Sequence, residues 1–503
     1  MKLNTVTIAI IFVLTFASLS GGAEAETIRK RKKDTKSPKA SKTPRKKGKA
    51  CKKVKSYKAS KESPLDAEGS RLDGIIEALV KCQDFSSYCQ DDFMVAREWF
   101  LDVANHPTDL PKDDDEYKNY MTERLILALT FSANCKDGCT LPNNWLSAKD
   151  HCKWTGVRCF DTSQQIATLN FTRNGLSGEF TFFGMKSLLW ISTDGNNLSG
   201  TFTVAGASNS LIILSLSGNK LSGFVGGKIL TNLVSLFLDD NEFKDDFIIT
   251  EENFPTSIKG LLLNRNKLSG FVGGKILTNL VNLHLEENEF KDDFIITAEN
   301  FPTSINILWL YGNKLTGFVG GKILTNLQTL FLEGNEFKDD FIITEENFPT
   351  SIKRLDLYGN TLTGFVGGKI LTNLQTLFLA DNEFKDDFII TEENFPTSIK
   401  RLYLSGNKLS GFVGLKILEN LEDLFLDGNE FKDDFIITEE NFPTSIKRLY
   451  LSGNSDLTSV NADAGMVSQL RDLELFGIEG ITVTEELCNR RPGLTIYPDT
   501  ACA

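Results

Sequence analysis

Histidine takes part in most acid–base and nucleophilic mechanisms, and this chain of 503 residues contains only three, His106, His151 and His284. Because a general base has to lie beside the nucleophile that it activates, Ser-His-Asp and Cys-His mechanisms have few candidates here. The three histidines are also far apart in sequence, which argues against a metal site built from several of them. We therefore predict that the protein is not an enzyme and needs no cofactor and no metal.

The nine cysteines favour a structural role. They lie before and after the repeats described below, and no two CxxC pairs occur, which argues against zinc. Local pairing is the simplest expectation, although sequence does not determine connectivity. Cys51 is left over, as a free thiol or as a link to another molecule. We predict disulfides among Cys82, Cys89, Cys135, Cys139, Cys152, Cys159, Cys488 and Cys502.

The first 25 residues have the three parts of a secretory signal peptide. Lys2 supplies the positive charge, residues 8–19 are apolar, and Ala23-Glu24-Ala25 offers small residues for cleavage. The apolar run is too short to span a bilayer comfortably, and no later stretch is apolar enough for a transmembrane helix. We predict a protein that is secreted, or that lies at the cell surface or in a cell wall, where disulfides persist.

Charge divides the rest of the chain into a basic segment and an acidic body. Residues 29–61 contain 17 Lys or Arg and one acid, a net +16, whereas residues 62–503 carry a net −27. Outside the cell, the basic segment is predicted to bind polyanions such as sulfated or uronic polysaccharides, phosphates, anionic membranes or silica. Alternatives are cleavage at the basic run 29–33 and docking on the acidic body. The signal peptide argues against nucleic acid as a partner.

Internal repeats determine the predicted fold. Each 47-residue repeat holds two units of the form L-x-x-L-x-L-x-x-N, for example 233–241 and 258–266. The L-x-L segment is expected to be a short strand with its leucines pointing inward, and the Asn to bond backbone groups of neighbouring coils. We predict an α/β leucine-rich-repeat solenoid with a parallel sheet on its concave face. The string FKDDFIIT marks the repeats, beginning at Phe243, Phe290, Phe337, Phe384 and Phe431.

Composition and periodicity divide the chain into five predicted segments. Three stretches before the repeats, 71–82, 93–104 and 120–131, have helical periodicity and are expected to cover the apolar end of the first coil. The repeat units begin at residues 166, 188, 211, 233, 258, 280, 305, 327, 352, 374, 399, 421, 446 and 470. The predicted segments are a signal peptide (1–25), a disordered basic linker (26–65), a helical, disulfide-bonded N-terminal cap region (66–165), a solenoid of 13 to 14 units (166–480) and a C-terminal cap (481–503).

The segment before the first repeat resembles the N-terminal cap of plant-type extracellular leucine-rich-repeat proteins. The resemblance rests on Trp145-Leu-Ser followed by Cys152-Lys-Trp-Thr-Gly-Val-Arg-Cys159, and on Asn-x-Leu-Ser-Gly runs such as the one at Asn174. The lead-in TERLILALTFSAN is similar to secreted leucine-rich-repeat proteins of diatoms and related algae. The Ile-Pro usual after Leu-x-Gly is replaced by Phe-Val-Gly-Gly. The resemblance covers residues 120–480 and implies a recognition module that binds peptides, glycans or wall-degrading enzymes.

The five 47-residue repeats differ from one another mainly in and beside their strands. Unselected drift would scatter changes along the whole repeat, so this concentration predicts selection on the concave face. Seven of the ten central outward positions are aromatic, which suits peptide anchoring or stacking on sugars. The alternative is a ladder of rings that only stabilises the sheet. The ten positions are Phe237, Leu262, His284, Trp309, Phe331, Asp356, Phe378, Tyr403, Phe425 and Tyr450.

Charges at neighbouring positions narrow the candidate site. Two triplets, 400/422/447 and 401/423/448, alternate in sign and are expected to neutralise one another. Lys353 and Arg354 have no acid at matching positions of the adjacent strands, and therefore predict an acidic peptide or a carboxylated or sulfated glycan as ligand. The predicted ligand-binding residues are Trp309, Tyr311, Phe331, Lys353, Arg354, Asp356, Tyr358, Phe378 and Tyr403.

Two further motifs lie away from this site. Asn170 and Asn197 begin glycosylation sequons, and a glycan on Asn170 would keep ligands from the first coils. An Asp pair recurs in every repeat, and such rows can collect Ca²⁺. Each pair follows a Lys and lies off the concave strands, so we interpret the rows as a solvated edge. The pairs begin at Asp245, Asp292, Asp339, Asp386 and Asp433.

Two functions remain open from the sequence. The first is a secreted recognition module that binds a peptide, a protein or an anionic glycan on its concave face. The second is a structural protein of a cell wall or matrix, held by the basic segment, with the solenoid as a spacer.

Overall fold

The structure is a computed structural model that describes residues 113–134, 145, 147, 149–161, 163–206, 208–489, 494–497 and 501. All of these belong to the second of two compact units, residues 55–503. The predicted signal peptide, basic linker, Cys51 and helices at 71–82 and 93–104 lie outside the described residues. Of the eight predicted disulfide cysteines, Cys82, Cys89, Cys135, Cys139 and Cys502 also lie outside them.

A 16-stranded sheet runs the length of the solenoid. Strand β1 (Val157–Cys159) pairs with the first repeat strand in antiparallel fashion, and all later pairs are parallel. Fourteen parallel strands coincide with the fourteen predicted repeat units, and a further one, β30, continues the sheet inside the predicted C-terminal cap. They are β2 (Ile166–Asn170), β4 (Trp190–Ser192), β6 (Ile213–Ser215), β8 (Ser235–Phe237), β10 (Gly260–Leu262), β12 (Asn282–His284), β14 (Ile307–Trp309), β16 (Thr329–Phe331), β18 (Arg354–Asp356), β20 (Thr376–Phe378), β22 (Arg401–Tyr403), β24 (Asp423–Phe425), β26 (Arg448–Tyr450), β28 (Asp472–Glu474) and β30 (Thr495–Tyr497).

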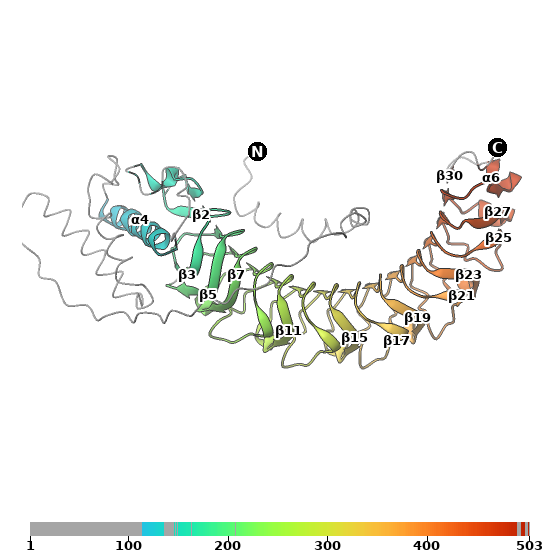
Figure 1. Cartoon of the computed structure of the whole chain (residues 1–503), viewed down its shortest axis with the longest axis horizontal. Coiled ribbons are helices and arrows are strands. Elements are labelled where there is room, and N and C mark those ends of the chain that lie inside the picture. The colour runs from blue at the N-terminus through green and yellow to red at the C-terminus, as the bar shows by residue number, and fades with distance from the viewer. Residues whose placement is uncertain are drawn as a thin grey trace, which may run out of the picture. The chain divides into compact units, whose positions relative to one another are not determined.

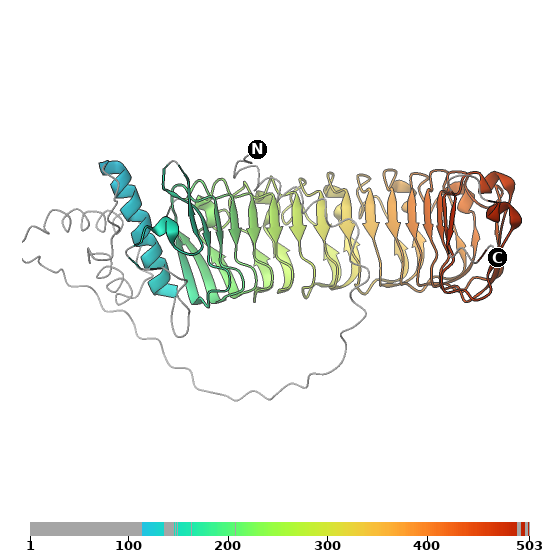
Figure 2. The ribbon, with the colours of Figure 1, turned by 90° about the horizontal axis from the view of Figure 1, so that it is seen from above.

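Short parallel sheets cover a second side of each coil. The solenoid is curved, and these sheets lie toward the outer side of the curve, whereas β2 and β30 of the long sheet lie on the inner side (Figure 1). Seen from above, the two sets of strands form adjacent rows (Figure 2). The sheets are β3–β5–β7 (Ser177–Phe183, Asn197–Ala205, Lys220–Val225), β9–β11 (Lys244–Ile248, Lys267–Val272), β13–β15 (Lys291–Ile295, Lys314–Val319), β17–β19 (Lys338–Ile342, Thr361–Val366), β21–β23 (Lys385–Ile389, Lys408–Val413) and β25–β27–β29 (Lys432–Ile437, Asp456–Ala462, Thr482–Val483).

A glycine turn leads from the second strand of a repeat into a short 3-10 helix. Gly320 has φ +78°, and a Cβ placed there would lie 2.3 Å from the carbonyl oxygen of Ile296 in the preceding coil. Only glycine tolerates both the left-handed backbone and this close approach. The first glycine of the Gly-Gly pair in the GFVGG motif is therefore required by this turn. The 3-10 helices are η5 (Gly227–Ile229), η6 (Gly274–Ile276), η7 (Gly321–Ile323), η8 (Gly368–Ile370) and η9 (Leu415–Ile417).

The asparagine of each repeat binds neighbouring coils, as predicted. Asn335 Nδ2 donates to the carbonyl oxygens of Leu310 and Leu332, both at 3.0 Å, and its Oδ1 accepts from the backbone N–H of Leu315 at 3.0 Å. Because the asparagine is buried, these bonds satisfy backbone groups that water cannot reach. The same pattern recurs along the solenoid, for example at Asn241 and Asn382.

Phenylalanine fills the core between the two sets of strands. Phe341 is buried and contacts the rings of Phe337, Phe348 and Phe365 at centroid distances of 5.3, 5.5 and 6.3 Å. Equivalent clusters occur in the neighbouring repeats, so stacked rings connect one coil to the next. This continuous apolar core accounts for much of the excess of phenylalanine in the composition.

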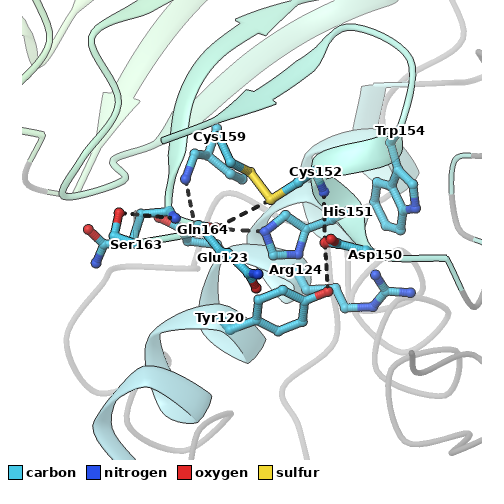
Figure 3. Close-up of a disulfide and its surroundings, with 12 residues drawn as sticks. Tyr120, Glu123, Arg124, Asp150, His151, Cys152, Trp154, Cys159, Ser163 and Gln164 are labelled. Atoms are coloured by element: carbon cyan, nitrogen blue, oxygen red, sulfur yellow. Dashed lines mark hydrogen bonds and ion pairs between the residues drawn. A yellow bond between two sulfur atoms is a disulfide. The ribbon is translucent and has the colours of Figure 1, made fainter. Parts of the chain in front are cut away.

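One helix covers the first coil. Helix α4 (Asp114–Asn134) includes the predicted helix at 120–131, and the short helix η4 (His151–Lys153) follows it in the chain. Tyr120 and Glu123 of α4 lie beside His151 of η4 (Figure 3). Glu123 Oε2 accepts from the backbone N–H of Ile166 at 3.0 Å, and Arg124 donates to the carbonyl oxygen of Lys149 at 2.9 Å. These bonds attach the helix to the exposed end of the solenoid, as the sequence predicts for this part of the cap.

Of the disulfides predicted for the N-terminal cap region, the described residues contain one. Cys152 and Cys159 are bonded, with 5.5 Å between their Cα atoms. Cys488 is also disulfide-bonded, in the short helix α6 (Glu485–Cys488), which follows α5 (Ala464–Val467). Its predicted partner, Cys502, lies outside the described residues. Among the helices that the structure describes, none is both long and apolar enough to cross a membrane.

Candidate binding face on the long sheet

The ten central outward positions form one continuous row along the sheet. The register pairs Trp309 with Phe331, Phe331 with Asp356, and Asp356 with Phe378, and the same alignment holds along the sheet. Because adjacent parallel strands are about 4.8 Å apart, side chains in such a row contact one another. The alignment predicted from the repeats is therefore confirmed.

The rings of this row between His284 and Tyr450 are stacked face to face in two groups, which Asp356 separates. Interplanar angles are 7–13°, so each ring inside a stack has neighbours on both faces and presents mainly its edge. The ladder alternative is thus present in the structure, and it removes the free ring faces that stacking on a sugar requires. The stacked pairs and their centroid distances are His284–Trp309 (5.1 Å), Trp309–Phe331 (3.8 Å), Phe378–Tyr403 (4.1 Å), Tyr403–Phe425 (4.1 Å) and Phe425–Tyr450 (4.3 Å).

Arg354 fills the gap that Asp356 leaves in the row. Its guanidinium carbon lies 5.0 Å from the ring centre of Phe331 and 4.2 Å from that of Phe378, and Nη2 is 3.1 Å from Asp356 Oδ2. The expectation of an uncompensated basic pair is wrong for Arg354, since residues two apart on a strand share a face. Its charge is neutralised within its own strand, while Lys353 is exposed.

Ion pairs near the C-terminal end form as the sequence predicts. Arg448 donates two hydrogen bonds to Asp423, at 2.5 and 2.6 Å, and Arg401 Nε lies 3.4 Å from the same carboxylate. Lys447 and Glu422 are 3.0 Å apart. Arg401 and Arg448 share the single carboxylate of Asp423, so the charges of this group are paired but not fully cancelled.

A second outward row, two residues after the first, carries acids that the sequence analysis did not consider. Glu286, Tyr311 and Glu333 follow one another in this row across three coils. Burial and the nearby Asp356 raise the pKa of Glu333 to about 7, and burial also raises the pKa of Asp356. Burial and the carboxylates of Glu286 and Glu287 raise the pKa of Tyr311 above its usual value. Because side chains two residues apart on a strand share a face, the sequence pattern could have predicted that these residues lie on the concave face.

The predicted ligand-binding residues differ in the surface that they offer. Phe331 and Asp356 are only 6% and 3% exposed, so little of either can contact a ligand. Tyr358 is 46% exposed, and its hydroxyl donates to Asp381 at 2.7 Å. The partly exposed side chains on this face are Trp309, Tyr311, Arg354, Phe378 and Tyr403.

The other predicted sites lie away from these strands. Asn170 and Asn197 are exposed, as glycosylation requires. The Asp pairs lie in the outer sheets, and both residues of each pair are exposed. Among the described residues, one group offers three ligating atoms within 4.8 Å of one another, His151, Cys152 and Cys159, and its two sulfur atoms are bonded to each other. That group therefore lacks the thiolates that a metal would need.

The fold and this face define a leucine-rich-repeat solenoid with a composite concave surface. No family profile matches the chain, and none of the curated proteins does. Solved structures with a similar fold include the Arabidopsis thaliana receptor kinase ectodomain GASSHO1/SCHENGEN3 in complex with CASPARIAN STRIP INTEGRITY FACTOR 2 (20% identity, 72% of this chain, 53% of that chain, TM-score 0.40). Others are the Arabidopsis HAESA ectodomain with an IDA peptide hormone (20%, 74% and 72%, 0.43) and the Yersinia pestis effector YopM (19%, 65% and 88%, 0.45).

The chain spans about half the length of the GASSHO1/SCHENGEN3 ectodomain. Sequence identities and TM-scores this low carry no information about a ligand of this chain. The assignment to the leucine-rich-repeat class rests on the repeats and on the strands, asparagines and turns that they form.

Proposed function

We propose that this protein is a recognition module whose concave face, around strands β12 to β22, binds a segment of a peptide or protein. One observation carries the proposal: most of the differences among the five repeats lie in and beside the strands of the long sheet. A purely structural face would keep the same side chains in every copy. Repeats that differ mainly there present a surface that changes along the sheet.

The ladder favours a peptide or protein over a glycan. Edges of stacked rings and the partly exposed Tyr311 and Tyr403 offer apolar contact and a hydroxyl, which suit an extended peptide. Sugar rings stack on open aromatic faces, and the inner rings of this row have none.

Replacement of Trp309 by Ala tests the position of the site. We expect the full chain carrying Trp309→Ala to lose at least about tenfold in affinity for peptides selected from a displayed library, as buried aromatic anchors do. Phe476→Ala is the matched control, since Phe476 is 48% exposed and lies near the C-terminal end of the sheet. If both variants bind as the unsubstituted chain does, the proposed face is wrong. Thermal unfolding of each variant reports whether the fold is retained.

The structural alternative is favoured by one specific observation, the mutual satisfaction of side chains on β20 to β26, where rings stack and charges pair. In that role the solenoid would be a spacer in a wall or matrix, held to polyanions by residues 29–61. Deletion of residues 26–61 should then abolish retention on a polyanionic matrix. Under the recognition proposal, the same deletion leaves peptide capture unchanged.

Secretion, glycosylation at Asn170 and Asn197, and the absence of catalysis complete the proposal. The disulfide between Cys152 and Cys159 supports an oxidising compartment. Burial lowers the pKa of His151 to about 3, which makes it a poor general base at neutral pH.

A further inference from the structure

Glu286 has a buried oxygen atom without a partner. Its side chain is 6% exposed, and Oε1 lies 3.0 Å from Nδ1 of His284. The second oxygen, Oε2, is buried and has no hydrogen-bond partner. An unpaired buried carboxylate oxygen costs free energy, because it loses water and gains nothing in return. Since Glu286 stands two residues after His284, its side chain leaves the strand on the concave side.

Acids outnumber available bases around this oxygen. Tyr311 lies in the next coil, and its hydroxyl interacts electrostatically with the carboxylates of Glu286, Glu287 and Glu333. The bases on either side are already engaged: Arg265 pairs with Glu287 and Asp240, and Arg354 pairs with Asp356. Around Tyr311 the carboxyl groups of Glu286, Glu287 and Glu333 therefore outnumber the nearby arginines, which are already paired.

We propose that Glu286, Trp309, Tyr311 and Glu333 form an acidic–aromatic site for a lysine or arginine side chain of the peptide or protein ligand, in which Trp309, Tyr311 and Glu333 contact the ligand and the buried carboxylate of Glu286 adds negative charge beneath it. This inference rests on the proposed function and specifies its chemistry. It reverses the expected charge of the ligand, from an acidic peptide or anionic glycan to a basic peptide segment.

The spacing of the two carboxylates suits a long cation better than a metal ion. Glu286 follows β12 and Glu333 follows β16, with β14 between them, so their backbones are roughly 9–10 Å apart. A metal ion held by both carboxylates would need an oxygen atom of each within about 2.5 Å of itself. A guanidinium or a lysine ammonium can lie over the intervening Tyr311, bond the partly exposed Glu333 and be attracted by the buried charge of Glu286.

Arg354 shows in the same face how a guanidinium is held. It lies between two aromatic rings and bonds a carboxylate. At the acidic–aromatic site the elements are similar: the Trp309 and Tyr311 rings meet edge to face at 6.2 Å, beside Glu286 and Glu333. Arg is expected to bind more tightly than Lys, because its planar group packs on rings.

A peptide array tests this inference with the full chain. The probes are 12-residue peptides in matched sets, in which one position is Arg, its uncharged analogue citrulline, or Glu. We expect citrulline to weaken binding at least about tenfold. Glu286→Gln combined with Glu333→Gln should abolish that preference, and each single variant should reduce it. Asp293→Asn, an exposed carboxylate of the same repeat in an outer sheet, should keep it.

The outcomes separate the two proposals. If Arg and citrulline peptides bind equally, or if the double variant keeps the preference, the acidic–aromatic site is wrong. Should binding then still depend on Trp309, the recognition proposal stands without it. An array with no enrichment of basic peptides also overturns the inference. Thermal unfolding of the Gln variants, which preserve side-chain shape, shows whether a lost preference comes from a lost fold.

Discussion

At the residue scale, the charge that the concave face offers to a ligand depends on which charged side chains pair with one another. Arg354 and Asp356 look like independent binding residues in the sequence, but the structure joins them into one unit between two rings. Glu286 has a partner, His284, on only one of its two oxygens, and no lysine or arginine among the described residues forms an ion pair with Glu286 or Glu333. The ligand chemistry of the face therefore depends on which outward side chains pair with one another. The residue types on the face do not reveal these pairings.

Replacement of Arg354 tests this pairing. Arg354→Ala leaves Asp356 buried without its cation and removes contacts with Phe331 and Phe378, so we expect a loss of about 1–3 kcal/mol in stability. It appears as a lower midpoint of thermal unfolding. Lys353→Ala is the matched control, because Lys353 is adjacent and exposed. Equal midpoints for the two variants would contradict the account of Arg354.

The pH dependence of stability tests the carboxyl pair. The pKa of Glu333 is raised to about 7, above the unfolded value of about 4.3, so the folded state holds a proton that the unfolded state releases between these values. The resulting stabilisation is complete below the unfolded pKa and is lost as pH rises through about 7.

Glu333→Gln removes this titration. The variant should lose less stability than the unsubstituted chain between pH 5 and pH 8, by on the order of 1 kcal/mol after solvent screening. Thermal unfolding at several pH values measures the difference. Glu336→Gln, at an exposed position of the same repeat, should follow the unsubstituted chain. Parallel curves for all three proteins would show that Glu333 does not titrate in this range.

At the element scale, each coil depends on backbone contacts that a side chain would break. Gly320 and Gly334 both have positive φ, +78° and +59°, but they differ in surroundings. A Cβ on Gly320 would lie 2.3 Å from the carbonyl oxygen of Ile296, whereas one on Gly334 meets nothing within 3.7 Å. A comparison of alanine substitutions at these two glycines therefore separates the cost of backbone strain from the cost of steric overlap.

Gly320→Ala should therefore destabilise more than Gly334→Ala. Both variants pay about 1–2 kcal/mol for the left-handed conformation, and only the first forces neighbouring coils apart. We expect an additional loss on the order of 1 kcal/mol or more for Gly320→Ala, measured as the difference in unfolding midpoints. Equal midpoints would mean that the coils adjust freely at this turn.

At the scale of the whole molecule, the described solenoid is a one-dimensional stack in which each coil contacts its neighbours. Its N-terminal end is held by α4, where Arg124 donates to the carbonyl oxygen of Lys149 and lies 4.7 Å from the ring of Trp154. Loss of such an end contact should loosen nearby coils and leave distant ones unchanged.

Hydrogen exchange tests this locality. Arg124→Ala should speed amide exchange in β2 to β6 and leave exchange in β20 to β26 unchanged. Lys118→Ala, an exposed position on the same helix, should affect neither region. Faster exchange along the entire solenoid would show that the stack unfolds as one cooperative unit.

The sequence by itself determined the repeat class, the positions of fourteen strands and the alignment of their outward residues. It could do so because backbone periodicity and inward leucines follow directly from a repeated pattern. Only the tertiary structure decided that the rings cover one another, that Arg354 turns to Asp356, and that Glu286 keeps an unpaired oxygen. These outcomes depend on side-chain directions between coils, and strand register alone leaves those directions open.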